Sequence, residues 1–281
     1  MTYLRKPEWI RSRFRSEMNF SQTKNIISNN DLQTICTSGR CPNKSECWSR
    51  GTATFMILGE ICTRSCKFCN TLTGKPLPPD SAEPQKIAVA IREMKLHHTV
   101  VTSVDRDDLN DKGASHWAAT IRTIRNENPL ITIEVLIPDF DGKTTLLQQI
   151  IDEKPAIISH NLETVRRLTP LVRSRAKYET SLKVLRYIAE NKVVSKTSIM
   201  LGLGEKHNEI LELMDDVVAA GVQILTIGQY LQPSRKNIPV AEYIQPEKFE
   251  EYHKIGLQKG FKIVESAPFV RSSYHAEKHI F

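Results

Sequence analysis

All six cysteines of this 281-residue chain lie in one stretch near its start. They form two triplets, Cys36-x4-Cys41-x5-Cys47 and Cys62-x3-Cys66-x2-Cys69. Three thiolates on a tight loop can bind three irons of a cubane iron–sulfur cluster and leave the fourth iron without a protein ligand. The spacing therefore predicts an open iron at which another molecule can react.

Structural zinc is the simplest alternative interpretation of these cysteines. Zinc usually takes four ligands, with Cys-x2-Cys pairs set some distance apart. Each triplet here lacks a nearby histidine, because the first histidines are His97 and His98. This disfavours zinc and, with it, the rival hypothesis of a zinc-stabilised RNA-binding protein.

The charge pattern bears on possible partners. The formal net charge is +7, but the basic residues are scattered among 32 acidic ones. Nucleic-acid-binding surfaces usually gather basic residues in a patch or stripe. We therefore expect no nucleic-acid partner. The positive net charge attracts anionic partners at long range, and an acidic carrier protein fits this attraction as well as RNA does.

Length and composition predict one large domain in a reducing compartment. With 40% hydrophobic residues, the chain can bury a core without disulfides. Cysteines confined to the first quarter favour metal ligation in a reducing cytoplasm over a secreted disulfide framework. No apolar run approaches the roughly 20 residues of a membrane span, and residues 1–16 lack the apolar region of a secretory signal. We expect a cytoplasmic protein without a membrane partner.

Beyond residue 53, strand-like and helix-like segments alternate. The strand-like segments are 54–58, 99–103, 131–137, 156–159, 196–201 and 223–230, with a further short one at 262–265. The helix-like segments are 83–96, 115–127, 144–152, 178–190, 207–220 and 246–256. This alternation predicts a parallel sheet with crossover helices. About six strands are too few for an eight-stranded barrel but enough for a partial one.

The segments that carry chemistry have predicted places relative to this sheet. The second triplet directly follows strand 54–58, and sites in parallel α/β folds lie beyond the carboxyl ends of the strands. The first thirty residues resemble an arm with little core of its own, and Gly39 and Pro42 predict a ligand-wrapping loop for the first triplet. His275 and His279 stand four residues apart, but we expect a solvated tail instead of a metal pair.

The second triplet, with Phe68 before its last cysteine, resembles the signature of the radical S-adenosylmethionine (SAM) enzymes. The resemblance implies that the amino and carboxylate groups of SAM chelate the open iron. It also implies cleavage of SAM to methionine and a 5′-deoxyadenosyl radical, which removes hydrogen from an unactivated carbon. A fourth cysteine would occupy the iron that SAM needs.

The first triplet, placed just ahead of that motif, resembles the lipoyl synthases, and the resemblance covers almost the whole chain. The matching segments are RKPEW at 5–9, CPN at 41–43, ECW at 46–48, TATFM at 52–56, TSVDRDDL at 102–109, HNLET at 160–164, RSRA at 173–176, MLGLGE at 200–205 and RSSY at 271–274. A biotin-synthase-like enzyme is the nearest alternative, and the first triplet and the RSSY tail speak against it. The chain departs from the family pattern at residues 37–40 and at Asn237, where relatives often have histidine.

This resemblance implies sulfur insertion at C6 and C8 of an octanoyl chain already linked to a lysine of a lipoyl carrier protein. It implies SAM and two 4Fe–4S clusters. The ligands would be Cys62, Cys66 and Cys69 for the SAM cluster, and Cys36, Cys41, Cys47 and Ser273 for an auxiliary cluster. The auxiliary cluster would be consumed as the sulfur source. A serine ligand suits that role, because a hard oxygen leaves soft iron more easily than a thiolate does.

The same resemblance implies SAM contacts, partners and a division of the chain. The SAM contacts would be Phe68, Ser103, Asp105, Asn161, Glu163 and Arg173. The carrier would be the E2 lipoyl domain of a 2-oxoacid dehydrogenase or the glycine cleavage H protein, and the electron donor flavodoxin or ferredoxin. We expect an α/β fold: a partial (βα)6 TIM-type barrel at 51–265, a cluster-binding arm at 1–50 and a closing tail at 266–281.

Two other motifs have more than one interpretation. Asp105, Asp107 and Asp108 form an acidic run that suggests a divalent cation, although neither a phosphate loop nor calcium-loop spacing accompanies it. Residues 202–205, Gly-Leu-Gly-Glu, resemble a phosphate-cradling turn but lack the third glycine of a dinucleotide fingerprint. A tight strand-to-helix connection explains this turn as well as contact with the SAM adenosine does.

Overall fold

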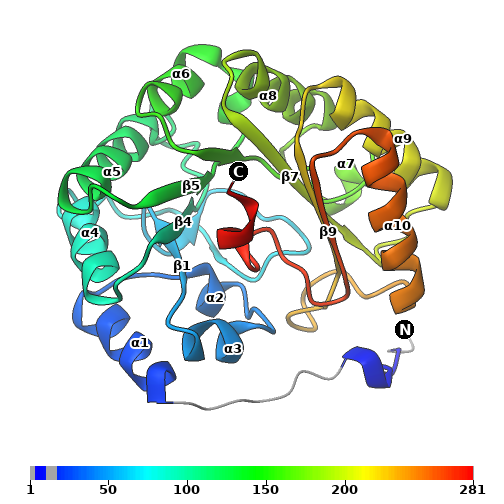
Figure 1. The fold of residues 1–281 in the computed structure, drawn as a ribbon, viewed down its shortest axis with the longest axis horizontal. Coiled ribbons are helices and arrows are strands. Elements are labelled where there is room, and N and C mark those ends of the chain that lie inside the picture. Colours follow the sequence, from blue (N-terminus) through cyan, green and yellow to red (C-terminus); the bar gives the residue numbers. More distant parts are fainter. Residues whose placement is uncertain (1–3, 11–17, 281) are drawn as a thin grey trace.

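The computed structural model describes residues 4–10 and 18–280, and it shows a ring of parallel strands surrounded by helices (Figure 1). The main sheet consists of β1 (Thr54–Ile57), β4 (His98–Ser103), β5 (Thr132–Leu136), β6 (Ile157–Ser159), β7 (Val194–Leu201), β8 (Ile224–Gln229) and β9 (Ile263–Ser266). Spatial order follows chain order, and neighbouring strands are parallel throughout. Residues on both faces of β7 and β8 are buried, as expected for a parallel sheet that is covered on both faces.

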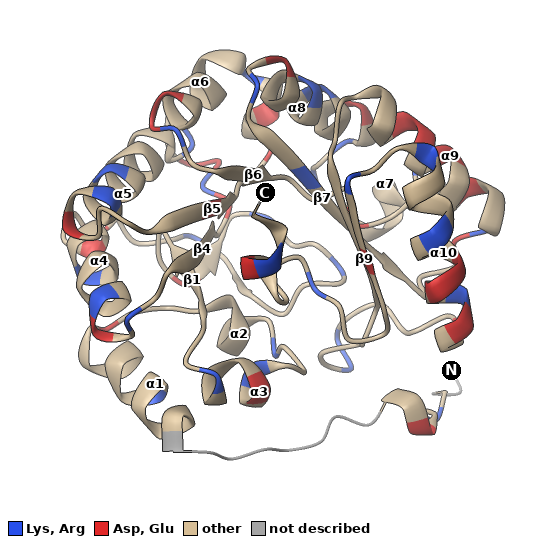
Figure 2. Ribbon diagram, in the orientation of Figure 1, with Lys and Arg blue, Asp and Glu red and all other residues tan. Residues whose placement is uncertain are grey.

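Helices form the outer layer of the ring (Figure 1). They are α4 (Glu83–Glu93), α5 (Ala114–Glu127), α6 (Thr144–Asp152), α8 (Tyr178–Glu190), α9 (His207–Ala219) and α10 (Pro246–Lys259). The short α7 (Thr169–Val172) and the 3-10 turn η2 (Phe140–Gly142) belong to the connections after β6 and β5. In α6, Leu147 and Ile150 lie on one face at helical spacing and are fully buried in the core. Figure 2 shows acidic and basic residues interspersed on the outer helices.

The predicted partial (βα)6 barrel is confirmed. Within the described ranges, six strand–helix units are followed by β9 as a seventh strand, which corresponds to the predicted segment 262–265. The sheet stays open because its two edge strands, β1 and β9, do not pair with each other in the described part of the chain. In this same part, no helix is long and apolar enough to cross a membrane.

The segment before β1 covers the free edge of that strand. Thr34 forms an antiparallel bridge with Phe55, and the Met56 N–H donates to the Gln33 carbonyl at 2.9 Å. Such pairing hides backbone groups that an edge strand would otherwise expose. Residues 1–3 and 11–17, which include most of the stretch expected to lack a secretory signal, lie outside the described ranges.

The first triplet lies on two short helices and the segment between them, so the loop predicted from Cys36 is wrong at the helical residues 36–38 and is confirmed only for residues 39–43. The helices of this arm are η1 (Glu8–Ile10), α1 (Met18–Asn29), α2 (Ile35–Ser38) and α3 (Lys44–Ser49). Cys36 belongs to α2 and Cys47 to α3. Phe20 of α1 packs on Trp48 of α3 with ring centroids 5.5 Å apart. Tertiary packing therefore stabilises helices that are too short to form alone. The turn residues Gly39 and Pro42 lie in the segment between α2 and α3.

The tail turns back into the centre of the ring and ends in the 3-10 turn η3 (Ala276–His279) (Figure 1). The expected solvated tail is therefore wrong, because His279 is fully buried. Its Nδ1 lies 3.0 Å from Nζ of Lys196 on β7, which in turn pairs with Glu134 on β5 at 2.7 Å. Burial lowers the pKa of His279 to about 3, so the imidazole is neutral and accepts a hydrogen bond from Lys196. A buried ion pair is stable only when further hydrogen bonds satisfy its remaining protons. His279 supplies one such hydrogen bond to the ammonium group of Lys196.

Candidate active site

The second triplet lies on a loop that starts at the carboxyl end of β1. Two short parallel strands, β2 (Ile61–Cys62) and β3 (Leu72–Thr73), close the base of the loop. The Gly74 N–H also donates to the Cys62 carbonyl at 3.1 Å. The three cysteines are therefore held on one short, closed segment at the end of the sheet where parallel barrels place their sites.

Backbone N–H groups point at the sulfurs of this loop. Cys62 Sγ receives them from Arg64 at 3.4 Å and Asp105 at 3.3 Å, and Cys69 Sγ receives that of Thr71 at 3.5 Å. Hydrogen bonds to sulfur are a standard feature of iron–sulfur sites. Without iron, burial raises the pKa of Cys62 to about 12, so cluster binding must release its proton.

Among the described residues, no three His, Cys, Asp or Glu side chains lie close enough to bind one metal ion together. In a cubane cluster each thiolate binds a different iron, so its protein ligands need not converge on one point. All six cysteines are free of disulfide bonds.

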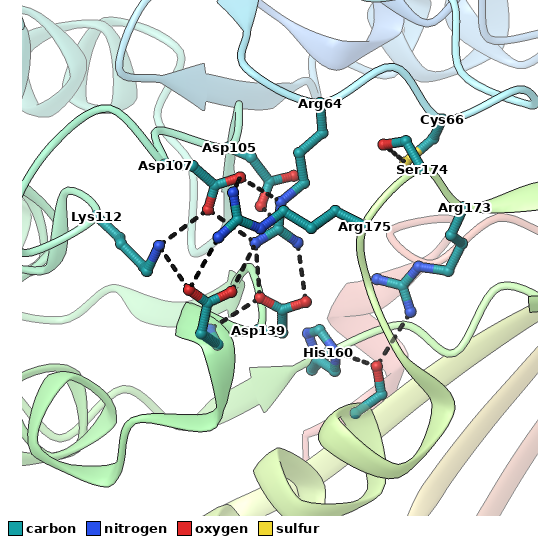
Figure 3. Close-up of polar contacts among 12 residues, drawn as sticks. Arg64, Cys66, Asp105, Asp107, Lys112, Asp139, His160, Arg173, Ser174 and Arg175 are labelled. Carbon is teal, nitrogen blue, oxygen red and sulfur yellow. Dashed lines mark hydrogen bonds and ion pairs between the residues drawn. The ribbon is translucent and has the colours of Figure 1, made fainter. Parts of the chain in front are cut away.

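Arg64, between the first two cysteines of the loop, anchors the loop to two neighbouring strand ends (Figure 3). Its guanidinium donates to both carboxylate oxygens of Asp107 at 2.7 and 3.0 Å, and to both of Asp139 at 2.8 Å. Asp105 lies 3.3 Å away, and the Arg64 side chain is only 3% exposed. Burial opposes ionisation of Asp107, but its hydrogen bonds with Arg64 outweigh that effect and lower its pKa to about 2. Two bidentate pairs make this the strongest polar anchor near the loop.

The hypothesis of a divalent cation at the acidic run is wrong, because lysine and arginine side chains already form ion pairs with the carboxylates of Asp107 and Asp108. Lys112 bridges Asp107 at 3.1 Å and Asp141 at 2.8 Å. Asp108 accepts two hydrogen bonds from Arg106, each 2.9 Å long. The acidic run is thus the negative half of a charge network.

The predicted SAM contacts gather near this loop. Asp105 Oδ2 lies 3.9 Å from Cys62 Sγ, and burial raises the pKa of Asp105 to about 6. Ser103 ends β4, and its buried hydroxyl has no hydrogen-bond partner in the described part of the chain. Phe68, within the loop, is partly buried against the core formed by the later strands.

The remaining predicted contacts follow β6. Asn161 donates to Glu163 at 3.1 Å, and Arg173 donates to the Asn161 carbonyl at 3.1 Å. Burial raises the pKa of Glu163, and the charge of Arg173 opposes that rise. The buried Nε of Arg173 has no partner among the described residues. Since buried polar atoms are normally paired, this Nε and the Ser103 hydroxyl fit a site that takes a polar ligand.

Asn237 and Arg64 support the loop, and sequence reasoning assigned neither of them a role. Asn237 Nδ2 donates to the carbonyls of Cys69 at 2.7 Å and Lys67 at 3.3 Å. The sequence signal that could have revealed the role of Arg64 is a basic residue inside the triplet together with two acidic residues, Asp107 and Asp139, that follow the next two strands. For Asn237, the signal was its departure from the family pattern.

The turn at residues 202–205 is a tight strand-to-helix connection. The Glu205 carboxylate accepts hydrogen bonds from the N–H groups of Gly202 and Leu203, both at 3.0 Å. Gly202 has a φ of +99°, and a Cβ there would lie 2.2 Å from Gln229. The backbone donors that a phosphate would need are therefore taken, and glycine serves the turn itself.

The first triplet faces a cavity of about 510 Å³ at the amino ends of β1 and β4. The cavity is lined by all three cysteines, by Thr54 and His98 at the strand starts, and by Arg271 and Ser273 of the tail. Burial, together with a smaller contribution from the other two cysteines, raises the pKa of Cys47 to about 12. Burial also raises the pKa of Cys36, and the buried indole N–H of Trp48 has no hydrogen-bond partner in the described ranges. Three thiols and a free donor fit an iron–sulfur cluster.

The tail brings Ser273 to this cavity and lies between the two triplets. Thr54 Oγ1 donates to Ser273 Oγ at 2.8 Å. The adjacent Ser272 donates to Asn161 at 3.2 Å, on the side of the predicted SAM contacts. Tyr274 donates to Glu46 of α3 at 3.0 Å. One short segment therefore contacts the surroundings of both triplets.

Comparisons with known proteins identify the family of the chain. The model of the radical SAM superfamily matches residues 56–217. The chain is 66% identical over 278 residues to a lipoyl synthase of Parabacteroides distasonis, covering 99% of each chain. It is 61% identical over 280 residues to a lipoyl synthase of Phocaeicola vulgatus, covering 100% of this chain and 99% of the relative.

Solved structures share the fold at low identity. Methylornithine synthase (PylB) matches 89% of this chain and 82% of its own, with a TM-score of 0.57 and 10% identity. Streptococcus suis SuiB bound to S-adenosylmethionine matches 81% of this chain and 55% of its own, with a TM-score of 0.61 and 10% identity. The full-length relatives decide against the biotin-synthase-like and RNA-binding alternatives. By its radical SAM barrel and its full-length relatives, this chain belongs to the lipoyl synthases.

Proposed function

We propose that this chain inserts two sulfur atoms, at C6 and C8 of an octanoyl chain linked to a lysine of a carrier protein, to give a lipoyl group. The observation that carries the proposal is the presence of two cysteine triplets at opposite ends of β1. One lies beside the predicted SAM contacts, and the other faces a cavity of about 510 Å³ together with Ser273. Generating a radical from SAM needs one cluster, so a second triplet facing its own cavity points to a further role in the reaction.

A member of the radical SAM superfamily binds a 4Fe–4S cluster and SAM. We assign that cluster to Cys62, Cys66 and Cys69. When bound, the cluster and SAM supply the 5′-deoxyadenosyl radical, one for each C–H bond, that removes hydrogen from the octanoyl chain. The N–H groups of Arg64 and Asp105 hold the Cys62 sulfur in place. No histidine or carboxylate base is assigned, because hydrogen leaves as an atom.

For SAM itself we propose contacts from three segments. Arg173, with its unpartnered buried Nε, suits the carboxylate of SAM, and Asn161 suits the ribose. Phe68 suits the edge of the adenine because it lies within the cluster loop. Ser103, Asp105 and Glu163 would line the rest of the pocket.

For the auxiliary cluster we propose the ligands Cys36, Cys41, Cys47 and Ser273. This cluster would supply both sulfur atoms. The support is that all four residues line one cavity, and that the tail reaches it through the hydrogen bond between Thr54 and Ser273. An oxygen ligand on iron is easier to displace than a thiolate, which suits a cluster that must come apart.

The substrate of a lipoyl synthase is a protein that bears an octanoyl group. We propose the E2 lipoyl domain of a 2-oxoacid dehydrogenase or the glycine cleavage H protein as carrier, and flavodoxin or ferredoxin as electron donor. We further propose a cytoplasmic location, an arm at 1–50, a barrel at 51–265 and a tail at 266–281. Six free cysteines without disulfides suit that reducing compartment.

The test is the mass of an octanoyl-lysyl peptide after anaerobic incubation with the reconstituted protein, SAM and a strong reductant. We expect a gain of two sulfur atoms and a loss of two hydrogens. An unchanged peptide with release of 5′-deoxyadenosine would overturn the proposed substrate while leaving the SAM chemistry intact. The Ser273→Ala variant is the matched control, and we expect it to cleave SAM without forming the lipoyl product.

A further inference from the structure

Thr54, the first residue of β1, lines the cavity of the proposed auxiliary site. Its side-chain hydroxyl donates to Ser273 Oγ at 2.8 Å. Thr54 is only 6% exposed, so water competes little for its hydroxyl. One buried strand residue thus holds the tail beside the first triplet.

Ser273 depends on such a contact because its own segment is irregular. Residues 267–275 lie between β9 and η3 and belong to neither a helix nor a strand. A serine side chain has three staggered orientations, and backbone position alone does not select one. The neighbouring contacts, Ser272 with Asn161 and Tyr274 with Glu46, fix the path of the tail but not the direction of the Ser273 hydroxyl.

We propose that Thr54 is a positioning residue that orients Ser273 Oγ toward the cavity of the first triplet. This inference rests on the proposed function, in which Ser273 and three cysteines hold the auxiliary cluster. Thr54 donates the hydrogen, so a lone pair of Ser273 Oγ stays available for iron. The three cysteine ligands do not contact the Thr54 hydroxyl in this proposal. Only the iron bound by Ser273 therefore depends on Thr54.

The test compares Thr54→Val, which keeps the β-branched shape, with Thr54→Ser, which keeps the hydroxyl. Thr120→Val is the matched control: Thr120 is fully buried, and its hydroxyl donates to the His116 carbonyl within α5. The measurements are iron and sulfide per chain after anaerobic reconstitution, and Mössbauer and EPR spectra that separate four-iron from three-iron clusters.

We expect the auxiliary site of Thr54→Val to shift from a four-iron to a three-iron cluster, while Thr54→Ser and Thr120→Val keep four irons. SAM cleavage should be equal in all of them. Lipoyl formation should fall roughly tenfold in kcat for Thr54→Val, which corresponds to the loss of one hydrogen bond, with KM for the octanoyl peptide unchanged.

A wild-type four-iron spectrum in Thr54→Val would overturn the inference, as would failure of Thr54→Ser to retain the fourth iron. Loss of SAM cleavage in Thr54→Val would also overturn it, because the effect would then be general. Ser273→Ala separates this inference from the proposed function. If Ser273→Ala keeps the four-iron signal, the proposed ligand is wrong. If Ser273→Ala loses it and Thr54→Val keeps it, only the role of Thr54 is wrong.

Discussion

The two cysteine triplets are held in place by different means. The second lies on one closed loop, and Arg64, 3% exposed, ties that loop to Asp107 and Asp139 through two bidentate pairs. The first is divided between two short helices, α2 and α3, and the segment between them. Its proposed fourth ligand, Ser273, comes from the far end of the chain, and its hydroxyl is held by Thr54.

This difference in attachment implies a difference in how readily each site rearranges. Breaking a buried ion pair leaves an uncompensated charge and costs about 3–5 kcal/mol, whereas a single neutral hydrogen bond contributes about 1 kcal/mol. The second triplet therefore suits a cluster that stays in place through every turnover. The first suits a cluster whose surroundings must open when its sulfur is used.

The largest expected effect separates the two triplets by function. Replacing Cys62, Cys66 or Cys69 by Ala should abolish SAM cleavage. Replacing Cys36, Cys41 or Cys47 by Ala should leave SAM cleavage in place and abolish the lipoyl product. Release of 5′-deoxyadenosine and the mass of the peptide are the two measurements. If the first-triplet variants also lost SAM cleavage, the two sites would not be independent.

The next effect tests the anchor of the second triplet. Arg64→Ala should lower the free energy of unfolding by about 3–5 kcal/mol, because Asp107 and Asp139 lose a buried partner. Arg40 occupies the matching place inside the first triplet, but it is exposed, and within the described ranges its side chain donates only to the Pro233 carbonyl, at 3.1 Å. Arg40→Ala should cost no more than about 0.5 kcal/mol. Urea unfolding of the two variants gives the comparison, and equal losses would contradict it.

Acid should weaken the attachment of the tail before that of the second triplet. Burial lowers the pKa of His279 from 6.5 to about 3, so its contribution to stability is complete above pH 6.5 and is lost as the pH falls toward 3. The pKa of Asp107 is lowered from 3.8 to about 2, so its contribution is lost only between those values. His279→Gln should therefore flatten the fall in stability between pH 6.5 and pH 4, by at most about 1.4 kcal/mol per pH unit. Urea midpoints across this range are the measurement, and an unchanged slope would show that the imidazole is not the sensitive group.

The smallest expected effect concerns the ion pair between Arg50, which directly follows α3, and Glu277 of the tail. Arg50 and Glu277 are 2.5 Å apart, but their side chains are 38% and 40% exposed. Arg50→Ala should cost less than about 1 kcal/mol, and added salt should reduce the difference from wild type because it screens exposed charges. A double-mutant cycle with Glu277→Ala measures the pair. A coupling as large as that expected for Arg64 would mean that the first triplet is as firmly anchored as the second.

Sequence patterns were sufficient for the barrel but not for the details of either triplet. Helix 178–190 and helix 144–152 have the predicted bounds, because a stripe of apolar residues at helical spacing is a local property. The predicted loop around Cys36 was wrong, because turn residues there lie between helices that form only by packing on α1 and β1. The predicted solvated tail was wrong, because the partner of His279 is Lys196, a lysine buried within the sheet.

The sequence by itself determined the cysteine spacing, the alternation that builds a parallel barrel, and the place of the second triplet after the first strand. These depend on neighbours in the chain, so they are visible without a structure. The tertiary structure alone decided which charges and hydroxyls meet. Arg64 pairs with residues 43 and 75 positions away, and Thr54 bonds a serine 219 positions away. The Arg64 contacts depend on the order of the strands, which brings the segments after β1, β4 and β5 together at the carboxyl end of the barrel. The Thr54 contact depends on the path of the tail, which returns from β9 to the amino end of β1.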